Sequence, residues 1–161
     1  MKKIFFPLVC LAFFISSCKK SVSGGTLTAY INGTMETFNT NAVAELTSGG
    51  GAYKLAIGGS AGDPASTDQI YLAITGVNNI VPGNYSAVSA SGDVAVMAYQ
   101  KPGNIGYSAD DHFNNPVKIT ISSISGSNVQ GSFTGNLILV LGASSDSTKT
   151  ITNGTFNVSL Q

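Results

Sequence analysis

The chain of 161 residues carries 8 lysines or arginines against 8 aspartates or glutamates, so charged residues make up only 10% of it, while 19 positions are glycine. This balance excludes the concentrated basic surface that phosphate binding needs, and nucleic acid is therefore not an expected partner. Many glycines and few charges are typical of short strands joined by turns, in a chain long enough for one well-packed domain.

The N-terminus has the organisation of an export signal. Two lysines precede an apolar stretch over residues 4–15, which is too short to span a bilayer because a spanning helix takes about 20 apolar residues. Next comes the tetrapeptide Ile15-Ser16-Ser17-Cys18. It resembles the lipobox of bacterial lipoprotein signals, and this resemblance implies cleavage after residues 1–17 and lipidation, including palmitate, on Cys18.

Two alternatives for this segment stay open: an ordinary secretory signal cut near Ser17, and a retained membrane anchor. Lys19 and Lys20 and the glycines that follow favour a cut signal, with a lipidated cysteine and flexible linker over residues 18–25. Several acyl chains anchor a protein stably, whereas one chain binds reversibly. We therefore expect a lipid-anchored protein of the cell envelope, at the outer membrane and on either its periplasmic or its external side.

From Leu27 onward, apolar and polar residues alternate with the period of two that predicts β-strands in a single domain over residues 26–161. The expected strands cover residues 27–31, 34–38, 42–46, 52–57, 70–75, 94–99, 117–122, 129–135, 137–141 and 155–160. The expected turns are Asn32-Gly33, Gly49-Gly50-Gly51, Pro82-Gly83-Asn84 and Ser125-Gly126-Ser127-Asn128. This pattern predicts an all-β fold, an antiparallel β-sandwich of about nine or ten short strands, with an open β-barrel as the alternative.

The sequence also predicts how three tyrosines and one apolar stretch are placed relative to solvent. Tyr30, Tyr71 and Tyr99 fall on the strand phase opposite the aliphatic residues. They are expected either to form exposed platforms for a sugar or to pack at sheet edges with their hydroxyls in water. The run over residues 137–141 is continuously apolar, which predicts a strand covered on both faces.

Both ends of the expected domain resemble a known group of proteins. Residues 117–135 followed by residues 151–158 are similar to the ending of uncharacterised Bacteroidota lipoproteins, in which a Gly-Ser-Phe-Thr-Gly-like strand leads to a closing Gly-x-Phe strand. Residues 27–38 are similar to their start. The resemblance implies a β-sandwich-like fold and an envelope location, and no mechanism. Surface-exported members often carry acidic residues after the lipid cysteine, where this chain has Lys19 and Lys20.

The sequence offers little material for catalysis or metal binding. His112 is the single histidine, and the many serines in turns are expected of any β protein. Asp110, Asp111 and His112 form the densest group of metal-ligand types, but consecutive side chains rarely reach one ion, so solvated loop charges are the expectation. We predict no cofactor, no catalytic residue and no metal ligand, in a β-domain that binds a glycan or an envelope protein or is structural. The alternative is a hydrolase or metal-dependent enzyme that uses the His112 loop.

Two loops are candidate sites. Residues 100–115 form the longest run without alternation, and loops of that length are generally functional or mobile. The ligand residues expected in it are Tyr107, Asp110, Asp111, His112 and Phe113, while the alternative is a surface excursion pinned to the sheet by its aromatic residues. Asp146-Ser147-Thr148 resembles an O-glycosylation site of exported Bacteroidota proteins, with Ser147 as the acceptor, although so short a match also arises by chance.

Overall fold

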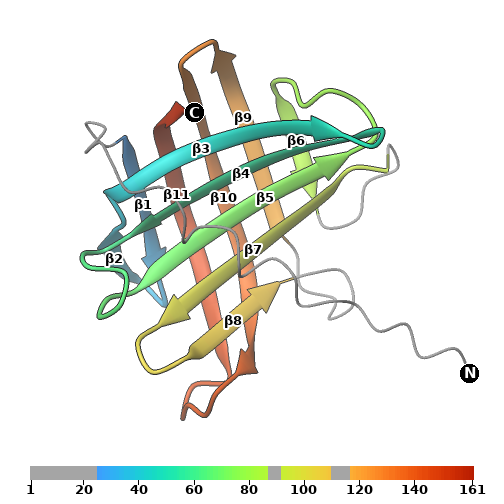
Figure 1. Ribbon diagram of the computed structural model, residues 1–161. Helices are drawn as coiled ribbons and strands as arrows, with labels where there is room; N and C mark the ends of the chain where they lie inside the picture. The colour runs from blue at the N-terminus through green and yellow to red at the C-terminus, as the bar shows by residue number, and fades with distance from the viewer. Residues whose placement is uncertain (1–24, 87–91, 110–116) are drawn as a thin grey trace, which may run out of the picture.

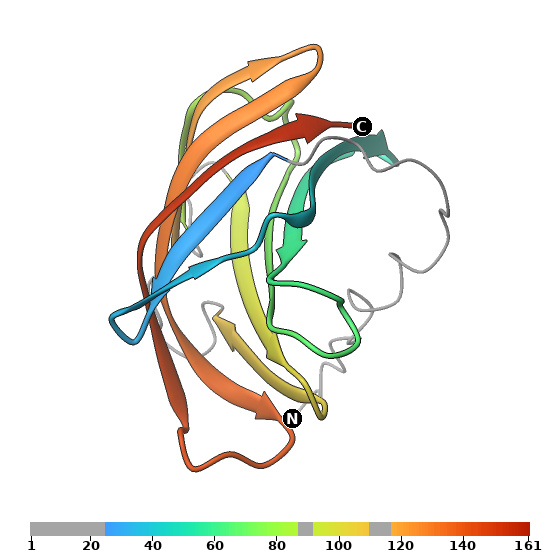
Figure 2. The same ribbon diagram turned by 90° about the vertical axis from the view of Figure 1, so that its left-hand side faces the viewer.

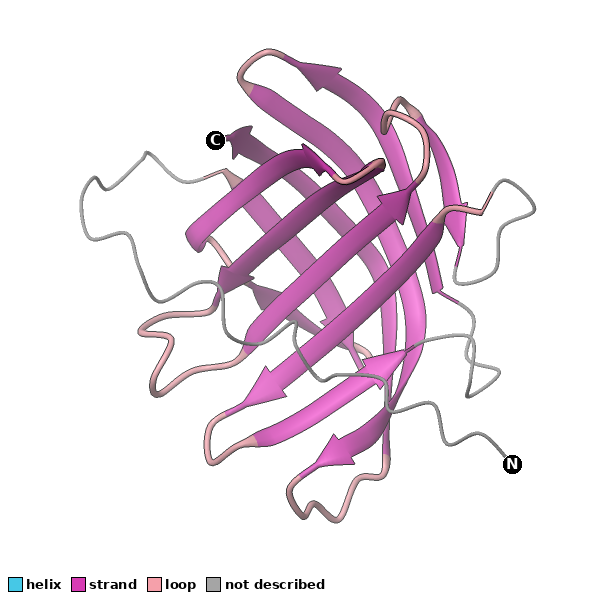
Figure 3. Cartoon of the chain, turned by 45° about the vertical axis from the view of Figure 1, so that its right-hand side comes forward, coloured by secondary structure: helices cyan, strands magenta, loops and turns pink. Residues whose placement is uncertain are grey.

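A computed structural model describes residues 25–86, 92–109 and 117–161 of the chain. The described residues form eleven strands: β1 (Thr26–Ile31), β2 (Thr34–Thr37), β3 (Thr40–Gly49), β4 (Ala52–Ser60), β5 (Gln69–Gly76), β6 (Gly83–Ser86), β7 (Val94–Lys101), β8 (Ile105–Ala109), β9 (Val117–Ser125), β10 (Asn128–Leu141) and β11 (Thr148–Leu160). The all-β prediction is confirmed, and within these ranges no helix is long and apolar enough to cross a membrane (Figure 3).

The strands make a sandwich-like fold of two layers that cross one another (Figures 1 and 2). One layer has the order β2-β1-β11-β10-β9-β6, and the other has the order β3-β4-β5-β7-β8. All pairs are antiparallel except β11 with β3. That parallel pair joins the layers along one side, and β10 joins them along the other by pairing with β8. Long strands that pass from one layer to the next are a known way of forming the corners of such sandwiches.

The core lies between the layers and is built from alternate residues of each strand. Expected inward sets such as Leu27, Ala29 and Ile31 on β1 are buried. The same holds for Ile70, Leu72 and Ile74 on β5 and for Val117, Ile119 and Ile121 on β9. Two aromatic rings of the core, Phe133 and Phe156, stack with centroids 6.3 Å apart. Burial of these side chains is the main source of stability for the fold.

The Asn32-Gly33 turn confirms the sequence prediction and also fastens the β1–β2 hairpin to β11. Both residues have positive φ, 51° and 84°, as the tight turn between Ile31 and Thr34 requires. The backbone N–H of Asn32 donates to the carbonyl oxygen of Thr150 over 2.9 Å, and the Thr150 N–H donates to Asn32 Oδ1 over 2.8 Å. An asparagine here therefore serves both as a turn residue and as an extension of the ladder.

The expected facing of strand β7 is wrong. Ala95, Met97 and Tyr99 point into the core, rather than Val94 and the residues in phase with it. The reason is the register with β5, which sets Tyr99 opposite Ile70 and Met97 opposite Leu72 on the buried face. Because both phases of this strand are apolar in the sequence, only the pairing decides between them.

Three further expectations about strands are wrong. Residues 137–141 belong to the single long strand β10, and its end is not covered on both faces, since Val140 is 48% and Leu141 41% exposed. Gly83 and Asn84 do not form a turn but begin β6, whose Tyr85 is buried. Residues 105–109 of the run expected to lack strand structure form β8, because they pair with both β7 and β10.

Candidate functional site

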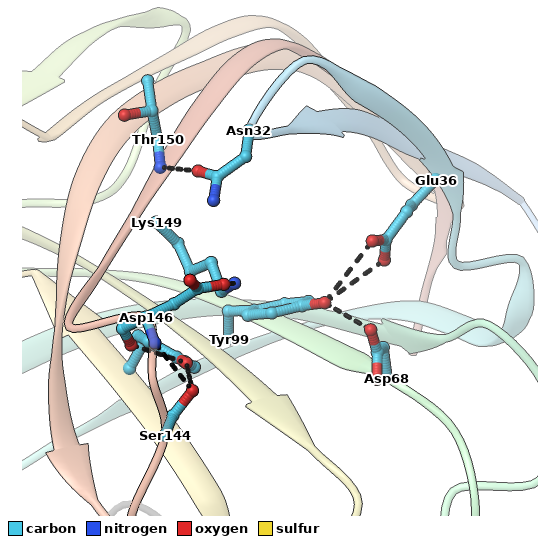
Figure 4. A network of polar contacts seen from close by, with 9 residues as sticks. Asn32, Glu36, Asp68, Tyr99, Ser144, Asp146, Lys149 and Thr150 are labelled. Carbon is cyan, nitrogen blue, oxygen red and sulfur yellow. Dashed lines mark hydrogen bonds and ion pairs between the residues drawn. The ribbon is translucent and has the colours of Figure 1, made fainter.

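A group of polar and aromatic side chains from both layers comes together around Tyr99 and Lys149 (Figure 4). We call this group the tyrosine cluster, and it consists of Glu36, Asp68, Tyr99, Tyr107, Asp146 and Lys149. They come from β2, the β4–β5 loop, β7, β8, the β10–β11 loop and β11. Residues far apart in the chain are thus brought together by both layers.

Tyr99 lies at the centre of the cluster and is 1% exposed. Its hydroxyl donates to Asp68 Oδ2 and lies 3.4 Å from each carboxylate oxygen of Glu36. Its ring meets Phe38 edge-on with centroids 6.4 Å apart, and the ring of Tyr107 is 6.0 Å away. One phenol from β7 therefore connects β2 of the opposite layer to the β4–β5 loop.

Glu36, Asp68 and Tyr99 form one half of the cluster, in which two half-buried acids surround one hydroxyl. Burial raises the pKa of Glu36 above its ordinary value, and the charge of Asp68 raises it further, against smaller lowering effects of Lys101, the Tyr99 hydroxyl and Lys149. Burial and then the bond to Asp68 raise the pKa of Tyr99 well above its ordinary range. Tyr99 therefore stays protonated and donates its hydroxyl hydrogen at neutral pH.

Lys149 forms the other half of the cluster. It points inward from β11 with 7% exposure, and its Nζ lies 2.7 Å from Asp146 Oδ2 and 5.3 Å from the centroid of the Tyr107 ring. The hydrogen bond from Lys149 lowers the pKa of Asp146. The Tyr107 hydroxyl lies 3.0 Å from both Ser144 Oγ and the carbonyl oxygen of Asp146. These contacts hold the β10–β11 loop against β8, so this half of the cluster fastens a loop.

The structure describes only some of the residues that the sequence predicts for a ligand or modification site. Tyr107 is a core residue with 1% exposure, so it is not available on a surface loop. Asp110, Asp111, His112 and Phe113 lie outside the described residues, as does Cys18. Ser147 is exposed in the β10–β11 loop, where its carbonyl oxygen accepts a bond from the Leu139 N–H over 2.8 Å.

Of the three tyrosines weighed as sugar platforms, only Tyr30 is exposed, at 38%, while Tyr71 is half-buried and Tyr99 is buried.

Most of the tyrosine cluster could not be predicted from the sequence, although the sequence contains one signal of it. On β11 the phase that contains Ile151 is buried, and Lys149 is on that phase. A lysine on the apolar phase of a strand indicates a buried ion pair or a site, because an unpaired charge is costly in the core. Asp68 and Asp146 gave no such signal, because both lie in loops.

The cluster does not have the ligand set of a metal site. In the three described ranges, no three side chains of His, Cys, Asp or Glu come together in a way that could hold an ion. The cluster brings only two carboxylates together, those of Glu36 and Asp68, and both face the hydroxyl of Tyr99.

A second surface stands out on the outer side of the β2-β1-β11-β10-β9-β6 layer. Strand register places one residue from each strand in a single row across it, in the order Thr37, Thr28, Thr155, Ser132, Thr120 and Asn84. All six are exposed or half-buried. We call this row of six residues the hydroxyl face, because its side chains end in hydroxyl or amide groups.

Comparison of the chain with protein-family models, with curated proteins and with solved structures finds no match.

Proposed function

We propose that this chain is a lipid-anchored protein of the cell envelope whose β-domain binds a partner and catalyses no reaction. The location is supported by the N-terminal signal, with its short apolar stretch and the tetrapeptide that ends at Cys18. The outer membrane is the membrane we expect.

The binding role is supported by one observation, the division of polar side chains between the inside and the outside of the sandwich. Ionisable groups of the tyrosine cluster are held by internal bonds: the half-buried Glu36 and Asp68 bond to the core residue Tyr99, and Lys149 pairs with Asp146, so these groups fasten strands and loops. Uncharged hydroxyl and amide groups are displayed outside, in register across six strands. Such an arrangement suits recognition by hydrogen bonding better than it suits proton transfer.

The location is tested by lipid labelling of the full chain in a bacterial host. We expect a palmitate analogue to label the wild-type chain, and the Cys18→Ala variant to lose both the label and its place in the membrane fraction. Cys10→Ala is the matched control, since Cys10 lies inside the apolar stretch and not at its end. Equal labelling of Cys18→Ala and wild type would refute the lipid anchor.

A further inference from the structure

We infer that the hydroxyl face binds a neutral, extended polysaccharide chain. This inference rests on the proposed function, because it names the partner that the β-domain would bind. Four features of the face support it: the register that sets its side chains in one row, its lack of charge, its hydrogen-bonding groups and the contacts between its side chains.

The alignment gives the face the dimensions of an extended ligand. Its central row crosses six adjacent strands, from Thr37 at one edge to Asn84 at the other. With neighbouring strands about 4.8 Å apart, the row is about 24 Å long. A row of that length offers hydrogen-bonding groups to several consecutive sugar units.

The charge of the face selects a neutral partner. Along the strands of this layer, three residues are charged, and two of them, Glu36 and Lys149, point inward to the tyrosine cluster. Lys118 on β9 is the third and is exposed. An anionic polymer or membrane surface would meet one lysine here, whereas binding of phosphates or anionic lipids takes several.

The chemistry of the face favours a glycan over a protein. Serine and threonine hydroxyls and the asparagine amide both donate and accept hydrogen bonds, as the hydroxyls of a sugar do. Specific protein interfaces instead have a well-packed core enriched in aromatic residues, methionine and arginine. Tyr30 and Met35 are paired and exposed, but they lie beside the β2 edge and not at the centre of the face. The Tyr30 ring there offers an apolar surface on which a sugar ring can pack.

Contacts within the face hold its side chains in place before a ligand arrives. The hydroxyls of Thr28 and Thr155 lie 3.1 Å apart, and Thr120 Oγ1 donates to Asn84 Oδ1 over 2.8 Å. Each group keeps further donor or acceptor capacity after these contacts. Since β-branched side chains also have few rotamers, ordering the face costs little conformational entropy on binding.

Retention of the full mature chain, purified with its lipid in a mild detergent, on polysaccharide beads tests the inference. The beads carry dextran, mannan, xylan or β-glucan, and beads with heparin provide an anionic comparison. We expect retention of the wild type on at least one neutral polysaccharide. Thr155→Glu should weaken it about tenfold or more, because a carboxylate in mid-face would lose water without gaining a partner.

Thr75→Glu is the matched control, since Thr75 is an exposed strand residue on β5 of the other layer. It should bind as the wild type does, and both variants should keep the wild-type midpoint of urea unfolding. Thr155→Val, which removes the hydroxyl and keeps the shape, should also weaken retention.

Several results would overturn the inference. Undiminished retention of Thr155→Glu would exclude the face, and retention on heparin alone would exclude a neutral ligand. If the wild type binds no polysaccharide but self-associates or cross-links to an envelope protein, the inference fails and the proposed function stands. If the chain shows neither a lipid anchor nor any envelope partner, the proposed function fails as well.

Discussion

The substitution Tyr99→Phe tests whether the tyrosine cluster holds the two layers together. It removes one oxygen atom and keeps the ring, whose contacts with Phe38 and Tyr107 are at centroid distances of 6.4 and 6.0 Å. The hydroxyl that is lost donates to Asp68 and lies 3.4 Å from both oxygens of Glu36. The change therefore isolates the polar contribution of the cluster from its packing.

The expected cost follows from the kind of bond that is lost. A hydrogen bond to a charged group contributes about 1.5–3 kcal/mol, and both acids are partly exposed, so water replaces part of the lost bond. We expect the free energy of unfolding at neutral pH to fall by about 2 kcal/mol. That is a large fraction of the roughly 5–15 kcal/mol that stabilises a typical domain.

The assay is urea unfolding of the segment from Gly25 onward, followed by circular dichroism. Tyr85→Phe is the matched control, since the bonds of the Tyr85 hydroxyl within the described ranges are to the backbone of Val81, to its carbonyl oxygen over 2.6 Å and from its N–H over 3.0 Å. This neutral contact should contribute about 1 kcal/mol, so Tyr99→Phe should be the more destabilising of the two. Equal losses, or a loss at Tyr99 below about 0.5 kcal/mol, would refute the bridging role of its hydroxyl.

Two other predictions concern charge and close packing. The raised pKa of Glu36 means that the folded state binds its proton more tightly, so this group stabilises the fold below about pH 4.5 and the contribution is lost as pH rises through the folded pKa. Glu36→Gln should remove that loss, so the excess of its urea midpoint over that of wild type should grow as the pH rises through the folded pKa of Glu36, and parallel pH profiles would contradict this. Gly131→Ala should cost at least about 2 kcal/mol in the same assay, because a Cβ there would overlap the Thr120 carbonyl oxygen and the ring of Phe156. Gly126→Ala, where a Cβ meets open space, is the control, and equal stability of the two variants would show that the β9–β10 contact is looser than described.

The alternation of polar and apolar residues was sufficient to predict most strands and their buried faces. On β1, β5 and β9 the two phases differ clearly in polarity, so each strand has one favourable orientation. The Asn32-Gly33 turn was also predictable, because its positive φ angles favour these residue types. These features depend on neighbours in the chain, and the sequence alone therefore determined them.

Only the tertiary structure decided where pairing between distant strands overrides the local pattern. Both phases of β7 are apolar, and its pairing with β5 turned Tyr99 inward. Tyr107 was expected on a long surface loop, but bonds to β7 and β10 on either side made its segment a buried strand.

The two candidate sites were decided in the same way. The tyrosine cluster joins Glu36 to Tyr99 across 63 positions of the chain, and Thr28 meets Thr155 on the hydroxyl face across 127 positions. The alternation shows which side of its own strand a residue occupies, but hydrogen bonding between strands selects the residue that lies beside it. The sequence by itself thus determined the all-β class and the export signal that we expect, while the folding of two layers around one core decided which side chains meet.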